Sequence, residues 1–341
     1  MKPPACPRAF GPPLGRARLK QVAEDFQVEE ILGFTPSGEG EHVFLWVEKR
    51  GRNTEDVAAE LARFAGVPRR QVSYAGLKDR HALTWQWFCV HLPGRREWPW
   101  HDFRGDGFAV LRWARNRRRL RKGALQGNRF RLRLRDFDGD RAALEARLQQ
   151  IAGRGMPNYF GPQRFGHAGG NLAKAAAMLQ GEKVRSRHHR GLYLSAARAA
   201  IFNQVLALRV EAGCWERALP GDLLMFDDGG TFFRAGGIDA EIETRVARLA
   251  LHPTGPLWGE GEGAAGEAGA WERRAVSLWP ELAAALAREA GMQRRPLRVW
   301  VKALHWGWEE PAALRLSFTL PAGSYATGLV HELIETGEET P

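Results

Sequence analysis

Hydrophobic and polar residues alternate along the first part of the chain in the pattern of half-buried strands. The alternation is clearest in Phe26–Leu32 and His42–Val47, which the turn-rich segment Thr35–Gly40 joins. Further strand-like runs follow at Tyr74–Gly76 and Trp85–Leu92. We therefore expect several strands of one sheet in this region.

A helix is predicted between these two groups of strands. Thr54 can serve as its N-cap, with two acidic residues in the first turn. Val57, Leu61 and Phe64 form an apolar stripe at helical spacing, and Gly66 marks the end of the helix. This helix would pack its apolar stripe against the sheet.

From about residue 139 the spacing of the apolar residues becomes helical. Two stripes carry it: Leu144, Leu148 and Ile151, and then Ile201, Val205 and Leu208. Ser195 can act as the N-cap of the second helix. The Gly-rich segment Gly259–Ala270 predicts a flexible loop.

Strand-like runs return near the C-terminus. They lie at Leu297–Ala303 and Leu314–Leu320, before a short predicted helix near Thr327–Ile334. A chain of 341 residues suggests two domains, at roughly 150 residues per domain. The pattern therefore favours a sheet built from both ends of the chain, with the middle as an insertion.

Charge adds a candidate partner to this outline. The formal net charge is +11, and only eight of the 50 basic residues are lysines, so 42 are arginines. Such an excess favours a polyanionic partner, either nucleic acid or an acidic membrane surface. Planar guanidinium groups suit phosphate oxygens and stack on bases. A compositional habit of the source genome would also explain the arginines.

The densest charge lies between Arg112 and Arg135. That segment holds eleven basic residues and no acidic one, and its second half alternates arginines with Phe130, Leu132 and Leu134. One face of such a strand can pack while the other meets phosphates. The alternative is an ordinary solvated strand face, which the lack of acidic residues within the segment disfavours.

Cysteine usage and hydropathy restrict the compartment. The three cysteines, Cys6, Cys89 and Cys214, are odd in number and lack metal-ligand spacing, so neither a disulfide framework nor a zinc site is indicated. The N-terminus has no signal-peptide core, and we find no run of about 18 apolar residues. We expect a soluble cytoplasmic protein with no membrane partner and no metal. Without a long coiled-coil pattern, we expect a monomer.

The connection Tyr74–His81 is the most suggestive chemical feature. It places Asp79 among Lys78, Arg80 and His81, and neighbouring positive charge keeps a carboxylate ionised. Loops on a rigid scaffold commonly carry catalytic groups, so Asp79 could act as a nucleophile or a base. An ordinary surface ion pair would look the same in the sequence.

Seven segments, taken together and in order, resemble the TruD family of tRNA pseudouridine synthases. Any one of them is weak, but the ordered set covers almost the whole chain and is highly specific. They are Glu24–Glu29, Asn53–Thr54, Tyr74–Ala82, Lys122–Phe130, Pro157–Gly166, Leu194–Arg198 with Phe202–Asn203, and Leu320–Thr327.

The resemblance implies a fold and an activity. The fold would be α/β of the α+β type: a mixed, largely antiparallel sheet in a catalytic domain of pseudouridine synthase type, residues 1–153 and 304–341, with a large inserted α/β domain, residues 154–303. The activity would be isomerisation of uridine to pseudouridine at position 13 of tRNA, without metal or organic cofactor.

The resemblance also implies roles for individual residues. Asp79 matches the catalytic aspartate of the Gly-Leu-Lys-Asp motif, and the sequence does not separate covalent attack at C1′ from assisted elimination at the sugar. Phe26 and Tyr325 would line the base pocket, and Asn128 would hydrogen-bond the substrate. Lys20 could pair with Asp79. Members of the family often carry phenylalanine at the position of Tyr325, so no role is implied for its hydroxyl.

Other readings of these residues remain open. Phe26 and Tyr325 could be core aromatics, and Asn128 could be a turn residue. Pro157–Gly166 resembles a catalytic loop, but its residues also suit a buried polar hinge leading into the inserted domain, which we favour. For RNA binding, the expected contacts are Arg117, Arg118, Arg119, Arg121 and Lys122.

Two other functions compete with the isomerase. A non-catalytic RNA-binding protein would carry the same basic segment. A metal-dependent nuclease could use Asp25, Glu29 and Asp79, and chelation would stop it.

Overall fold

The computed structural model describes residues 2–94, 98–227, 229–309 and 311–337, and the chain forms two compact units. Unit 1 comprises Met1–Leu14, Arg141–Val301 and Ser324–Leu333, and unit 2 comprises Gly15–Asp140, Lys302–Gly323 and Ile334–Pro341. Residues 1–14, 141–153 and 324–333, which were predicted to belong to the catalytic domain, thus lie in the same compact unit as the middle of the chain. The division by function into residues 1–153 with 304–341 and residues 154–303 stays a prediction.

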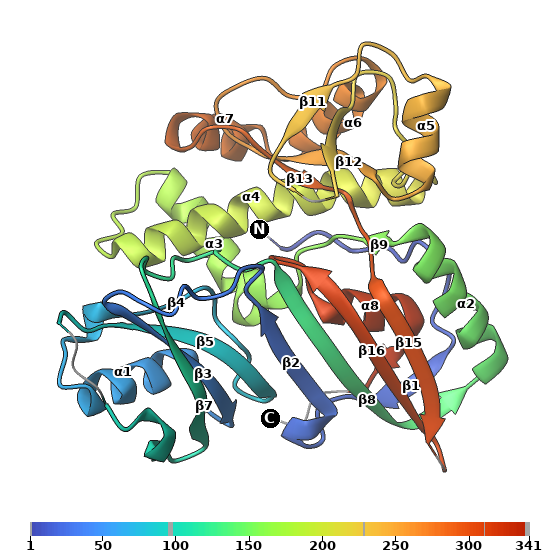
Figure 1. Ribbon diagram of the computed structural model, residues 1–341. Coiled ribbons are helices and arrows are strands. Elements are labelled where there is room, and N and C mark those ends of the chain that lie inside the picture. The colour runs from blue at the N-terminus through green and yellow to red at the C-terminus, as the bar shows by residue number, and fades with distance from the viewer. Residues whose placement is uncertain (1, 95–97, 228, 310, 338–341) are drawn as a thin grey trace. The chain divides into compact units, whose positions relative to one another are not determined.

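The described residues of unit 2 form the strands of one large sheet, the α-helix α1 and short 3-10 helices (Figure 1). The strands are β1 (Gly15–Arg18), β2 (Phe26–Ile31), β3 (His42–Arg50), β4 (Val72–Tyr74), β5 (Leu83–His91), β6 (Arg104–Gly105), β7 (Phe108–Asn116), β8 (Gly127–Gly139), β15 (Lys302–Glu309), β16 (Ala313–Pro321) and β17 (Glu335–Thr336), and the helix is α1 (Thr54–Phe64).

Unit 1 contains most of the helices. They are α2 (Arg141–Arg154), α3 (Gly170–Leu179), α4 (Arg187–Glu211), α5 (Ala240–Ala247), α6 (Gly266–Val276), α7 (Pro280–Glu289) and α8 (Ala326–Leu333). Its strands are β9 (Met156–Pro157), β10 (Leu223–Phe226), β11 (Phe232–Arg234), β12 (Leu251–Leu257), β13 (Gln293–Pro296) and β14 (Arg298–Val299).

The sheet of unit 2 joins both ends of the chain, as the sequence predicts. Its order is β15-β16-β8-β2-β5-β3-β7-β6, so the late strand β16 pairs with the early strand β8. The pairs β2–β5 and β1–β17 are parallel, and the other pairings in the described part of this sheet are antiparallel. The predicted mixed, largely antiparallel α/β fold is confirmed.

Strand β8 shows why the alternating sequence forms this sheet. Phe130, Leu132 and Leu134 are buried, and opposite them across the ladder lie Phe318, Leu316 and Leu314 of β16. Directly opposed residues share a face, so these six side chains stack in one apolar layer. The arginines between them project to the other face.

Helix α1 covers the half of the sheet that contains β3 and β5. Val57 and Leu61 of α1 are fully buried in a cluster with Val43, Leu45 and Val47 of β3. The helix begins one residue away from the prediction. Asn53 is the N-cap, whereas Thr54 is the first helical residue and turns its buried side chain to other partners.

The core of unit 1 is the 25-residue helix α4. The predicted N-cap, Ser195, is wrong: the helix begins nine residues earlier, after Ser186, whose side chain accepts the His189 N–H at 3.3 Å. By length and composition α4 could cross a membrane, and it alone among the helices of the described residues has this property. Of its apolar window 67% is buried inside the protein, which is usual for a core helix.

Two further sequence predictions in unit 1 are corrected. The expected flexible loop Gly259–Ala270 ends in helix α6, which starts at Gly266. The expected strand Leu297–Ala303 is broken into the whole of the short strand β14 and the start of β15. The run has strand-like apolar residues, but Leu297 and Val301 are buried outside any ladder, so burial alone explains them.

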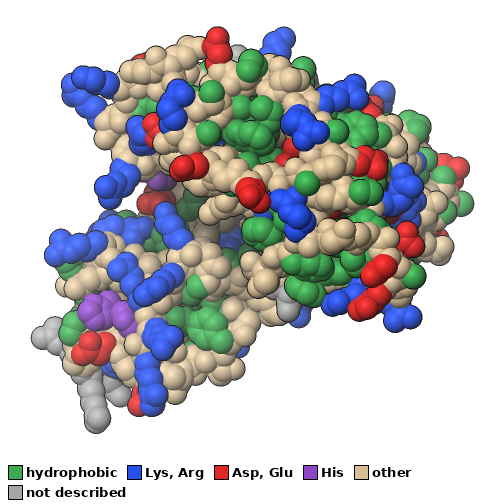
Figure 2. Space-filling model, turned by 90° about the horizontal axis from the view of Figure 1, so that it is seen from above, with side chains coloured by type: hydrophobic (Ala, Val, Ile, Leu, Met, Phe, Trp, Pro, Cys, Tyr) green, Lys and Arg blue, Asp and Glu red, His purple; other side chains and the backbone are tan. Residues whose placement is uncertain are grey.

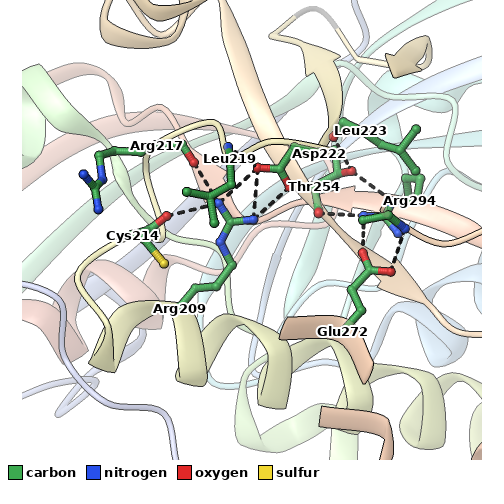
Figure 3. A network of polar contacts seen from close by, with 10 residues as sticks. Arg209, Cys214, Arg217, Leu219, Asp222, Leu223, Thr254, Glu272 and Arg294 are labelled. Atoms are coloured by element: carbon green, nitrogen blue, oxygen red, sulfur yellow. Dashed lines mark hydrogen bonds and ion pairs between the residues drawn. The ribbon is translucent and has the colours of Figure 1, made fainter. Parts of the chain in front are cut away.

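A network of buried ion pairs ties α4 and α6 to the strands of unit 1 (Figure 3). Arg209 of α4 donates to both carboxylate oxygens of Asp222 and to the carbonyl oxygens of Cys214 and Arg217. Arg294 of β13 pairs with Glu272 of α6 at 2.6 Å. Here each buried guanidinium has a carboxylate partner, the arrangement that makes a buried charge tolerable.

Candidate active site

Asp79 lies on the connection between β4 and β5, within unit 2. Its Oδ2 accepts a hydrogen bond from Lys20 Nζ at 2.6 Å, and its Oδ1 accepts the His81 N–H at 2.9 Å. The expected Lys20–Asp79 pair is thus present. The Asp79 side chain keeps 20% of its exposure, whereas that of Lys20 keeps 8%. The carboxylate is therefore held from two sides and is still open to solvent.

The charge state of Asp79 follows from these contacts. Burial by itself raises the pKa of the carboxyl, but the hydrogen bond and charge of Lys20, with the N–H and charge of His81, lower the pKa below its ordinary value. The carboxylate is therefore ionised at neutral pH, as expected. The cause differs in part, because Lys78 pairs with Glu30 and Arg80 donates to the Gly51 carbonyl.

Lys20 links Asp79 to an aromatic ring. Its ammonium lies 4.7 Å from the centroid of Phe26, the first residue of β2. The Phe26 ring is 6% exposed and meets Phe130 edge-on at 6.3 Å. Asp79, Lys20 and Phe26 thus form one local cluster, in which the mostly buried ring of Phe26 packs beneath the Lys20 ammonium.

Asn128 lies in the second position of β8, paired with Glu30 of β2 and Leu320 of β16. The alternative that it is a turn residue is therefore wrong. The register puts its side chain on the same face as Phe26 and Val28. Its Oδ1 is buried and has no hydrogen-bond partner within the described residues. A buried acceptor left unpaired is costly, and it can receive a donor from a ligand.

Tyr325 belongs to unit 1, where it precedes α8. Its hydroxyl accepts a hydrogen bond from Arg164 Nη2 at 2.9 Å, and its ring meets Phe160 edge-on at 6.2 Å. Arg164 also donates to Ser195 Oγ at 3.0 Å. The hydroxyl thus has a definite partner, which the sequence did not indicate.

The segment 157–166 contributes these contacts from inside unit 1. Asn158 is buried and accepts from Arg295 at 2.6 Å and from Ser324 at 3.2 Å. Burial lowers the pKa of Arg295 to about 10. The buried polar character is as expected. The segment lies inside unit 1, and its interpretation as a hinge leading into the inserted domain stays a prediction.

The carboxylates required by the nuclease alternative are engaged separately. Asp25 is fully buried against Arg135 at 2.8 Å, and Glu29 pairs with Arg129 at 3.0 Å. Among residues 2–94, 98–227, 229–309 and 311–337, no three His, Cys, Asp or Glu side chains are grouped so as to hold a metal ion.

The basic segment behaves differently in its two halves. The β8 arginines have acidic partners from neighbouring strands: Arg129 and Arg131 with Glu29, Arg133 with Glu309, and Arg135 with Asp25. The prediction that this strand face lacks acidic partners is therefore wrong. Acidic residues were absent from the segment but not from the sheet around it.

The loop between β7 and β8 carries the other half. Arg117, Arg118, Arg119, Arg121 and Lys122 are exposed, while Leu120 between them is 1% exposed and anchors the loop. Arg117 pairs with Glu39, and Arg119 donates to the Arg70 carbonyl at 2.7 Å. Lys and Arg side chains are spread over the face of the molecule shown in Figure 2. This loop is thus a basic surface held by one buried leucine.

Four buried polar residues support the Asp79 connection and were not found from the sequence. This polar cradle consists of Glu30, Lys49, Thr54 and Gln86. Thr54 Oγ1 accepts the Lys78 N–H at 3.0 Å and donates to Gln86, and Gln86 donates to the Gly76 carbonyl at 2.5 Å. For Glu30, Lys49 and Gln86 the available signal was a polar residue where the strand alternation calls for an apolar one, whereas Thr54 begins a helix and carried no such signal.

Comparison with known proteins follows the same outline. The family model described as "tRNA pseudouridine synthase D (TruD)" matches residues 12–186 and 172–333. A protein named tRNA pseudouridine synthase D from Pseudomonas entomophila (strain L48) is 50% identical over 338 residues, which span 96% of this chain and 94% of that protein. A protein of the same name from Methylococcus capsulatus is 48% identical over 333 residues, with the same coverage.

A solved structure from Methanosarcina mazei, described as a candidate tRNA pseudouridine synthase D, is similar in fold. The TM-score is 0.69 at 22% sequence identity, and the match covers 96% of this chain and 95% of that one. At this identity the similarity concerns the fold.

Proposed function

Because the chain belongs to the tRNA pseudouridine synthase D family, we propose that it isomerises uridine to pseudouridine in tRNA, at position 13, with Asp79 as the catalytic carboxylate. The observation that carries the proposal is the Asp79 side chain: ionised, fixed by Lys20 and the His81 N–H, and one-fifth exposed.

The reaction gives each group a task. The bond from C1′ to N1 of uracil breaks, the base turns, C5 bonds to C1′, and the proton lost from C5 is balanced by one gained at N1. No oxidant, reductant or co-substrate is required, and we propose that none is used. An ionised carboxylate can attack C1′ directly or assist elimination at the sugar.

The substrate base must leave its stack to reach Asp79. We propose that the unpaired Oδ1 of Asn128 accepts a hydrogen bond from the uracil N3–H, since an orphaned buried acceptor favours a donor ligand. Phe26, the aromatic side chain beside Lys20, would contribute aromatic surface next to the base. The basic loop at Arg117–Lys122 would bind tRNA phosphates.

The test uses the full chain, in parallel with and without chelator, and an unmodified tRNA transcript. After incubation, pseudouridine is mapped along the transcript. Pseudouridine at position 13 supports the proposal, and pseudouridine at another position corrects the site. Tight binding without any pseudouridine would favour the RNA-binding protein, and chelator-sensitive cleavage would favour the nuclease.

A further inference from the structure

Lys49 occupies an unusual position in the sheet of unit 2. Val43, Leu45 and Val47 of β3 alternate into the core under α1, and Lys49 continues that row with 0% exposure. Strand alternation places an apolar side chain here. A buried lysine at the end of an apolar row needs a physical reason.

The contacts of Lys49 point to the Asp79 connection. Its ammonium donates to the carbonyl oxygens of Asp79 at 2.8 Å, Arg52 at 3.0 Å and Lys78 at 3.4 Å. An ammonium has three N–H donors, so all three are used. The lysine therefore joins the loop after β3 to the main chain at Asp79 itself.

No carboxylate compensates this buried charge directly. Within the described residues, no acidic side chain lies at ion-pair distance from Lys49, unlike Arg209 and Arg294 in unit 1. Burial lowers the pKa of Lys49 to about 8, while the Asp79 charge acts to raise it and the Lys78 charge to lower it. A cation buried in this way is unfavourable for stability.

We propose that Lys49 is a positioning residue for Asp79: it fixes the main chain of the loop through three carbonyl oxygens, one of them the carbonyl of Asp79 itself. The inference rests on the proposed catalytic role of Asp79. Lys49 would hold the main chain of Asp79, while Lys20 and the His81 N–H hold its carboxylate, so both ends of the residue are fixed.

The charge state of Lys49 gives the proposal a pH signature. A neutral amine has only two N–H donors, so deprotonation leaves one of the three carbonyl oxygens without its partner. The other charges near the loop are Lys20, Lys78, Glu30 and the Arg52–Glu60 pair. The rate of the chemical step should therefore fall above about pH 8.

The test compares wild type, Lys49→Met and Lys49→Arg, with Arg294→Met as the control for loss of a buried cation in the other unit. Single-turnover rates of pseudouridine formation, tRNA Kd and hydrogen exchange of the amides of residues 75–82 are measured on folded protein. Lys49→Met should slow the chemical step by about 100-fold, because a small misplacement of a reacting group has an effect of that size. Its tRNA Kd should stay within about twofold, since binding rests on surface charge.

Exchange in residues 75–82 should rise in Lys49→Met and stay unchanged in Arg294→Met. Lys49→Arg keeps its charge at all accessible pH values, so the alkaline fall in rate should disappear. Should Lys49→Met fail to fold, the pH profiles of wild type and Lys49→Arg decide.

A normal chemical rate in folded Lys49→Met, unchanged exchange, or the same alkaline limb in Lys49→Arg would overturn the inference. Full activity of Asp79→Asn would instead overturn the proposed function, whatever the exchange data show.

Discussion

Both units contain buried cationic side chains, but the groups that accept hydrogen bonds from these cations differ between the units. In unit 1, Arg209 and Arg294 each meet a carboxylate, so the charges cancel inside the core (Figure 3). In unit 2, Lys49 bonds only main-chain oxygens, and Asp79, the carboxylate whose charge acts on it, remains partly open. A closed pair makes two buried charges tolerable, whereas an ionised carboxylate left partly open is available to a substrate.

The largest expected effect is on the rate of pseudouridine formation when the partly exposed carboxylate of Asp79 is removed. Asp79→Asn removes the carboxylate and keeps the shape, so the rate of pseudouridine formation should fall by about 10⁴-fold, as for loss of a reacting group. The protein should fold and bind tRNA, because the basic loop is unaffected. Single-turnover assays and filter binding measure both quantities, and an active variant would remove Asp79 from the chemistry.

Breaking a buried ion pair of unit 1 should lower the stability of the protein. Asp222→Ala leaves Arg209, which is 1% exposed, without its carboxylate, so the free energy of unfolding should fall by about 3–5 kcal/mol. Arg245→Met breaks the exposed Arg245–Glu241 pair of the same unit and should cost about 0.5 kcal/mol or less. Urea unfolding compares the two variants, and equal losses would contradict the distinction drawn for unit 1.

Much of the fold could be predicted from local patterns. Alternation gave β2, β8 and β16, because one face of each strand packs and the other does not. The same reasoning failed where burial occurs without a ladder, as at Leu297 and Val301, and where a long helix begins at polar residues, as α4 does.

The sequence predicted which residue is the candidate catalytic group better than it predicted which contacts keep that residue ionised. Asp79 and its pairing with Lys20, 59 residues away, were expected from the resemblance, but the local charge argument relied on the adjacent Lys78, which pairs with Glu30 instead. The acidic partners of the β8 arginines likewise come from other strands. Contacts between distant residues depend on sheet register, which local charge patterns do not contain.

Lys20→Met removes the ion-pair partner of Asp79 and so tests how far that partner controls the carboxylate. Without Lys20, burial raises the pKa of Asp79, so the acid limb of the rate profile should move to higher pH. Stability changes in the same sense: the contribution of the wild-type pair is complete above about pH 3.8 and is lost as the pH falls through the lowered pKa. At neutral pH the rate should fall by about tenfold from lost orientation. An unmoved acid limb in the pH–rate profile would show that another group controls ionisation.

The smallest expected effect is on tRNA binding, and it should differ between surface arginines with and without a carboxylate partner. No described acidic residue pairs with Arg118 or Arg121 in the basic loop, whereas Arg129 and Arg131 share Glu29. Changing the loop arginines to glutamine should weaken tRNA binding by about tenfold and lower the slope of log K against log salt by about 1 to 2. The same change at Arg129 and Arg131 should have less effect on both, because phosphate would have to displace a carboxylate already in place. Equal losses in the two double variants would mean that the ion pairs on β8 open when tRNA binds, and that pairing in the free protein does not identify the residues that meet RNA.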